Sequence, residues 1–109
     1  MIPERVGPMN EQNTRHLCAA YPELYGEPFA FACPDSWAPL LDDLSNELLE
    51  HIRATGLTLT VTDVKEKHNE LRFYADGTDE AADRIIETAE ERSRHIPAQE
   101  HPYLSRKGI

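Results

Sequence analysis

Residues 57–75 contain two alternating runs joined by a polar connection, and they constrain the fold more than any other segment. The run LTLTVTDV (57–64) alternates leucine or valine with threonine, as a half-buried strand does. The alternation slips at Asp63-Val64, where we expect a β-bulge. The run LRFYA (71–75) returns with Leu71, Phe73 and Ala75 facing inward and Arg72 and Tyr74 facing outward. Asn69 in the connection tolerates left-handed backbone. The segment therefore predicts an antiparallel hairpin.

Two amphipathic helices flank this hairpin. The first has a buried stripe at Leu40, Leu41, Leu44, Leu48, Leu49 and Ile52. We expect Asp35 or Ser36 to cap it, Trp37 and Pro39 to lie in its first turn, and Gly56 to end it. The second has its stripe at Ala82, Ile85, Ile86 and Ala89. We expect Thr78 to cap this helix and Pro97 to stop it.

The segment PFAFAC (28–33) alternates phenylalanine with small residues between two prolines, which predicts a short edge strand. The order β-α-β-β-α then gives an α+β fold, a two-layer sandwich with a small, mostly antiparallel sheet under two helices. We expect residues 1–20 to form a loose arm, with one helical turn near residues 14–20 left open. We expect residues 21–97 to form a single domain and residues 98–109 a tail.

Composition excludes several classes of function. The chain has 109 residues and a formal net charge of −9, and it has no cluster of Lys and Arg. Direct binding to nucleic acid is therefore not expected, because affinity for phosphates comes from such clusters. No run of apolar residues approaches the ~20 of a membrane span, and no signal peptide is recognisable, so we expect a cytoplasmic protein. Cys18 and Cys33 are interpreted as reduced thiols, although a bridge between them stays open.

No motif for catalysis or for a cofactor is present. The cysteines have no base near them in the sequence, and neither a GxSxG motif nor a glycine-rich phosphate loop occurs. We therefore expect no enzyme activity and no cofactor. The five histidines lack the spacing of a metal site. His95 and His101, on either side of Pro97, leave open a degenerate zinc site.

Surface residues provide the candidates for binding. Asp42, Asp43, Glu47 and Glu50 lie off the apolar stripe of the first helix and could dock on a basic protein surface. Arg72 and Tyr74, on the outer face of the hairpin, form a second candidate surface, because exposed aromatics are frequent hot spots. Trp37 is expected in the core. The alternative places Trp37 and Tyr74 in a pocket for a nucleotide or metabolite.

The runs FAFACPDSWAPLLDDL (29–44) and VTDVKEKHNELRFYADGTDEAADRIIETAEERS (61–93) together resemble an uncharacterised family of small phage and prophage proteins. Its members look like FxFxCGDGWxxLLDxL followed by VxQVKEKFGxLRFY. Here Pro34-Asp35-Ser36 replaces the Gly-Asp-Gly, and His68-Asn69 replaces the Phe-Gly. The Cys-x-x-Cys tail common in the family is missing. The resemblance implies the fold but no zinc ribbon, and it transfers no activity.

The sequence therefore predicts a small, acidic, non-enzymatic phage-type protein that acts by protein–protein contact in the cytoplasm of a bacterial host. The expected partner is a host protein or complex with a basic surface, and the expected role is inhibition of a host defence of the CRISPR–Cas kind or of another nucleic-acid-handling complex. The alternatives are a small-ligand module and a degenerate zinc protein. A free edge at PFAFAC could also pair two copies into a homodimer.

Overall fold

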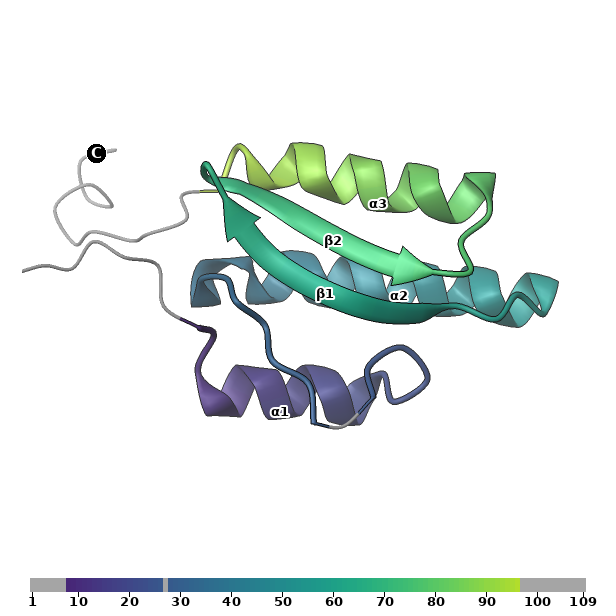
Figure 1. Cartoon of the computed structure of the whole chain (residues 1–109), viewed down its shortest axis with the longest axis horizontal. Coiled ribbons are helices and arrows are strands. Elements are labelled where there is room, and N and C mark those ends of the chain that lie inside the picture. The colour runs from purple at the N-terminus through teal and green to yellow at the C-terminus, as the bar shows by residue number, and fades with distance from the viewer. Residues whose placement is uncertain (1–7, 27, 97–109) are drawn as a thin grey trace, which may run out of the picture.

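A computed structural model describes residues 8–26 and 28–96. Its elements, in chain order, are α1 (Glu11–Ala20), a short 3₁₀ turn η1 (Asp35–Trp37), α2 (Ala38–Thr55), β1 (Thr60–Lys67), β2 (Glu70–Asp76) and α3 (Glu80–Ser93). Figure 1 shows the hairpin β1–β2 lying across α2, with α3 beside β2 and α1 on the far side of β1. The predicted α+β class is confirmed.

The hairpin has the predicted antiparallel pairing, with Val64 opposite Phe73 and Lys65 opposite Arg72. Its register shifts between Val61 and Asp63, so the bulge lies just before the predicted position. At the tip, His68 and Asn69 have φ values of 54° and 63°. Both residues of the two-residue turn are thus left-handed, which matches the right-handed twist of the flanking strands.

The segment PFAFAC does not form the predicted strand, because its pairing with β1 is limited to one parallel bridge between Ala32 and Lys65. The Ala32 amide donates to the Val64 carbonyl (3.0 Å), and the Ala32 carbonyl accepts from Glu66 (2.9 Å). Prolines at both ends of the segment limit further pairing, since proline has no amide donor. On its other side, the Phe31 carbonyl accepts from the Met9 amide at 2.9 Å. This segment is therefore not the free edge on which the homodimer prediction depended.

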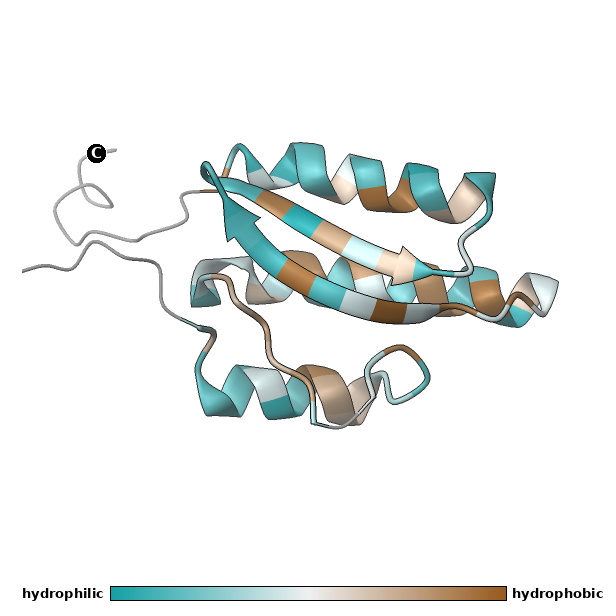
Figure 2. Cartoon of the chain, in the orientation of Figure 1, coloured by the Kyte–Doolittle hydropathy of each residue, from teal (hydrophilic) through white to brown (hydrophobic). Residues whose placement is uncertain are grey.

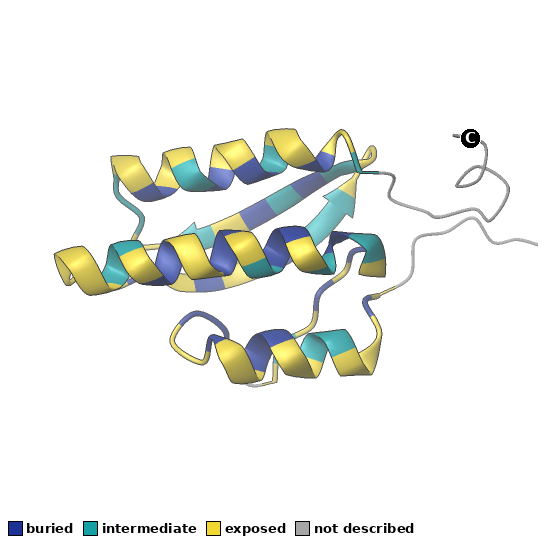
Figure 3. Cartoon of the chain, turned by 180° about the vertical axis from the view of Figure 1, so that it is seen from behind, coloured by how far each residue is buried: buried dark blue, intermediate teal, exposed yellow. Residues whose placement is uncertain are grey.

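The core lies between the hairpin and the helices. The inward side chains of the hairpin alternate with polar ones along both strands, as Figure 2 shows by colour. Seen from behind, the three helices bury one side and expose the other (Figure 3). The largest fully buried side chains include Trp37, Tyr25 and Phe31. Tyr25 also shares a 2.6 Å hydrogen bond with Ser45, so the polar group of each is satisfied inside the core.

The prediction of a loose arm over residues 1–20 is wrong for its second half. Residues 11–20 form α1, and Met9, Leu17 and Cys18 are buried in the core. The sequence did not predict the whole helix, because its apolar pattern is weak and only one short stripe of side chains packs inward. Residues 1–7 and the predicted tail, 98–109, lie outside the described residues.

The roles of two carboxylates at helix N-termini differ from the sequence prediction. Asp35 does not cap α2, because its Oδ1 accepts from the Asn10 amide (2.9 Å) and the Asn13 side chain (3.0 Å) at the start of α1. Asp79 rather than Thr78 caps α3, and its side chain accepts from the Ala82 amide at 2.8 Å. Gly56 ends α2 in left-handed conformation, as predicted.

The outer edge of β2 is covered by side chains of α3. The Leu71 amide donates to Ser93 Oγ at 2.9 Å, and the Phe73 amide donates to Glu90 Oε2 at 3.0 Å. An open row of strand amides can pair with another chain. Here α3 replaces a third strand over the middle of that edge.

Candidate functional site

The four acids predicted on the first helix do not form one free patch. The Tyr21 hydroxyl donates to Asp42, and the Asp43 carboxylate lies 3.5 Å from Arg92 of α3. Burial, followed by the hydrogen bond to Asp42, raises the pKa of Tyr21 to about 12, so this phenol stays protonated as a donor. Glu47 and Glu50 are the exposed pair that points outward.

The excess negative charge of the molecule is concentrated on two helices. Helix α2 carries four carboxylates against one arginine, and α3 carries five against two, so each has a net charge of −3. The helices run antiparallel, because Asp43 near the start of α2 meets Arg92 near the end of α3. We call the exposed carboxylates of these helices the acidic helical face; they are Asp43, Glu47 and Glu50 on α2 and Glu80, Asp83, Glu87 and Glu91 on α3. Figure 3 shows the exposed side of both helices. The hairpin is almost neutral by comparison, with four acids and three bases.

The outer face of the hairpin holds Arg72 and Tyr74, as predicted. Tyr74 is 48 % exposed, and among the described residues it is the only large hydrophobic side chain that is exposed. The Lys65 ammonium lies 5.6 Å from the centre of its ring, within the range of a cation–π contact. Arg72 is half-buried, with its guanidinium 3.6 Å from Glu70 and its buried Nε unpartnered. The surface is therefore one aromatic ring framed by paired charges.

Trp37 and Tyr74 do not share a pocket. Trp37 is fully buried, and its indole donates to the Ile96 carbonyl at 3.1 Å. The prediction that Trp37 belongs to the core is confirmed, and the pocket that would combine it with Tyr74 is wrong. An indole of this size is used for packing, and its one polar atom is satisfied inside the protein.

A different hollow adjoins Tyr74, between the edge of β2 and α3. It has a volume of about 270 Å³ and is lined by Phe73, Tyr74, Ala75, Thr78, Asp83, Ile86, Glu87 and Glu90. We call it the edge hollow. Glu90 is half-buried there, and desolvation raises the pKa of its carboxyl group although the Phe73 amide donates to it. The sequence could not reveal this site, because it depends on how α3 lies against β2.

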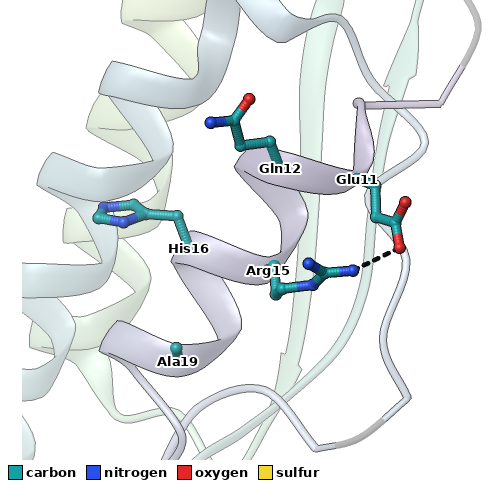
Figure 4. A pocket seen from close by; sticks show the side chains of 5 residues that line it. All are labelled: Glu11, Gln12, Arg15, His16 and Ala19. Carbon is teal, nitrogen blue, oxygen red and sulfur yellow. Dashed lines mark hydrogen bonds and ion pairs between the residues drawn. The ribbon is translucent and has the colours of Figure 1, made fainter.

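Another hollow, about 550 Å³, lies against α1 and is lined by Glu11, Gln12, Arg15, His16 and Ala19. Figure 4 shows that these side chains all come from one helix and that Glu11 pairs with Arg15. A surface of this kind is open to water, and ligand sites usually draw walls from several elements. We therefore place no site there.

His51 and Asp79 form a pair that sequence reasoning missed. The His51 Nε2 atom lies 2.9 Å from Asp79 Oδ2 and 3.0 Å from Oδ1. Their side chains are 18 % and 39 % exposed. The amide of Ala82, and then His51, hold the pKa of the Asp79 carboxyl group below its usual value. The pair connects the last turns of α2 to the start of α3. Its role in stabilising this contact between the helices is enough to account for it, so we assign it no further function.

Among the described residues, the thiols and histidines show no arrangement for chemistry. Cys18 and Cys33 are both buried and are not joined by a disulfide. Burial raises the pKa of Cys33 to about 12, which suppresses the nucleophilic thiolate. Within residues 8–26 and 28–96, no three His, Cys, Asp or Glu side chains converge as metal ligands would. His95 is exposed, and His101, its partner in the zinc hypothesis, lies outside the described residues.

No family model, no curated protein and no solved structure matches this chain. The resemblance to the phage family therefore stays a prediction. In the part of the chain that the structure describes, no helix has the length and apolar character needed to cross a membrane.

Proposed function

We propose that this protein is a non-enzymatic binding protein whose acidic helical face docks on a basic surface of another protein. The observation that supports the proposal is the concentration of charge, with net −3 on each of two adjacent helices beside an almost neutral hairpin. Such a field attracts a basic partner and raises its association rate. It also disfavours direct contact with phosphates, which nucleic acids present.

The partner that fits best is a protein whose basic groove normally holds nucleic acid. The resemblance to phage proteins favours a cytoplasmic role in a bacterial host, as an inhibitor of a defence complex of the CRISPR–Cas kind. In that role the carboxylates of the acidic helical face occupy positions that phosphates would otherwise take. No step of this proposal requires a catalytic residue or a cofactor.

The test is affinity capture from a bacterial lysate with matched charge variants. We expect a stoichiometric partner that is lost at about 0.5 M salt, where exposed charge pairs are screened. The variant Glu47→Lys/Glu50→Lys should lose the partner at low salt. The control Glu11→Lys/Asp63→Lys changes the net charge equally on α1 and the hairpin, and should retain it.

Two outcomes would reject the proposal. Capture that persists at high salt would exclude an electrostatic interface. Equal loss of the partner in both charge variants would show that net charge, rather than the acidic helical face, governs binding.

A small-ligand module receives less support from the structure. The edge hollow carries three carboxylates, which repel the phosphates of a nucleotide. A thermal-shift screen with nucleotides and cationic metabolites tests this alternative, because a ligand that binds only the native state must stabilise it.

A further inference from the structure

We propose that the edge hollow receives an arginine side chain from an extended segment of the partner protein, with the partner's backbone pairing at Ala75. This inference rests on the proposed function, because it specifies how a basic protein would be held. It places the anchor at one position on β2 and α3, apart from Glu47 and Glu50 of α2.

The edge of β2 is covered by α3 at some residues and not at others. The amides of Leu71 and Phe73 point away from β1 and bond to Ser93 and Glu90 of α3. In an antiparallel strand every second residue points the same way, so Ala75 directs its amide and carbonyl toward this edge. One turn before Glu90 in α3 is Ile86, which lines the edge hollow together with Ala75 and has no hydrogen-bonding group in its side chain. The capping by α3 therefore stops at Ala75.

The pairing of β1 supports this orientation. Val61 is opposite Ala75, and its amide bonds to the Leu24 carbonyl at 3.1 Å, away from β2. The two residues thus form a non-hydrogen-bonded pair, and Ala75 faces the edge hollow. An extended segment could add there by main-chain hydrogen bonds, as in β-strand addition.

The edge hollow is complementary in charge to a cation. Asp83, Glu87 and Glu90 line it, and no Lys or Arg is among its described lining residues. A cation brought near Glu90 adds to the attraction of Arg72 and offsets the cost that desolvation imposes on the Glu90 carboxylate. The hollow therefore favours a positively charged side chain.

The walls of the edge hollow suit an arginine better than a lysine. The half-exposed ring of Tyr74 forms one wall of the hollow, and the carboxylates lie on the α3 side. A planar guanidinium can stack on an aromatic ring and bond to a carboxylate with two nitrogens at once. A lysine ammonium offers only a point charge. The volume of about 270 Å³ suits one side chain better than a whole metabolite.

The test is an NMR titration of the purified ¹⁵N-labelled protein with a capped pentapeptide, acetyl-Thr-Val-Arg-Val-Thr-amide. We expect shifts of the backbone amides of Ala75 and Glu87. Replacing the arginine with citrulline keeps the shape and removes the charge, and should weaken binding about tenfold, the equivalent of one lost charged contact. A lysine peptide should bind with intermediate affinity.

Matched variants separate the edge hollow from the general field of the protein. Asp83→Asn/Glu87→Gln should weaken the arginine peptide about tenfold, whereas Glu11→Gln/Glu23→Gln, with the same change in net charge but away from the edge hollow, should leave it unchanged. All four positions are exposed, so both variants should fold. Equal weakening in both variants, equal binding of the citrulline peptide, or no shift at Ala75 would each overturn the proposal.

These results are independent of the lysate experiment. A protein that captures a partner through Glu47 and Glu50 but ignores the arginine peptide would retain the proposed function and lose this anchor. A protein that binds the peptide but captures no partner would retain this anchor and lose the proposed function.

Discussion

At the scale of single residues, Gly77 is a position that has no room for a side chain. Its φ is +82°, and a Cβ atom there would lie 2.2 Å from the Thr58 carbonyl oxygen. Gly56 has a similar φ of +79°, but a Cβ atom there would meet nothing within 4 Å. The two glycines thus share a left-handed backbone and differ only in the space around them.

Gly77→Ala should therefore destabilise the protein far more than Gly56→Ala. We expect about 1 kcal/mol for Gly56→Ala from the left-handed backbone, and about 3 kcal/mol or more for Gly77→Ala, where the clash adds to it. Urea unfolding of both variants measures the difference. Equal losses would mean that the Thr58 backbone moves aside without strain.

Cys33 provides a second prediction at this scale. With its pKa raised to about 12 by burial, its thiolate population at about pH 8 is roughly a thousandfold below that of an exposed thiol. Iodoacetamide should leave Cys33 unmodified in the native protein and label it completely in urea. Peptide mass mapping reads both states, and rapid native labelling would contradict the burial of this residue.

At the scale of elements, Asp79 connects two helices through charge. It caps α3 and bonds to His51 of α2, and its pKa is held below the usual value. A carboxyl group with a lowered folded-state pKa contributes stability above its unfolded pKa of about 4, and loses it as the pH falls through the folded-state pKa. Its contribution is therefore complete at neutral pH.

Asp79→Asn should thus be less stable than the wild type at neutral pH, and the difference should shrink as the pH falls from about 4 through the folded-state pKa. Asparagine remains a good cap, so the variant isolates the charge. Melting temperatures across this pH range provide the measurement. Asp76→Asn, which removes an exposed carboxylate at the end of β2, serves as the control. A difference that persists in acid would assign the effect to geometry.

The sequence predicted most elements because their patterns are local. The alternation in 57–75 and the leucine stripe in 40–52 each depend on neighbours within one element, and both are confirmed. PFAFAC has the local pattern of a strand, but a strand also needs a neighbour with which to pair. Its sequence cannot show that this pairing is limited to the bonds of Ala32 with Val64 and Glu66. The cap at Asp35 failed for the same reason, since its partners lie 22 and 25 residues away. The edge hollow requires β2 and α3 to be placed together, which no local pattern specifies.

At the scale of the whole molecule, repulsion between the two acidic helices should limit stability. Both carry net −3 and pack side by side. Raising the salt concentration from about 0.02 M to about 0.5 M shortens the screening length from roughly 20 Å to roughly 4 Å. Salt should then remove more destabilising repulsion than stabilising attraction, because exposed ion pairs contribute little to stability on their own.

We therefore expect the melting temperature to rise by about 5 °C over this range, equivalent to roughly 1 kcal/mol. Glu47→Gln/Glu50→Gln should raise the melting temperature at low salt and reduce the further gain from added salt. Calorimetry on both proteins provides the data. A melting temperature that falls with salt would show that ion pairs such as Arg92–Asp43 outweigh the repulsion.

The capping of β2 by α3 also makes the solubility of the hairpin depend on the last turns of that helix. Glu90 and Ser93 follow both strands in the sequence, so a chain that stops before them keeps the hairpin and loses its cover. The amides of Leu71 and Phe73 then lose these partners, and another copy can pair through them. A stop codon placed before residue 90 should therefore yield a product that aggregates rather than a smaller folded protein.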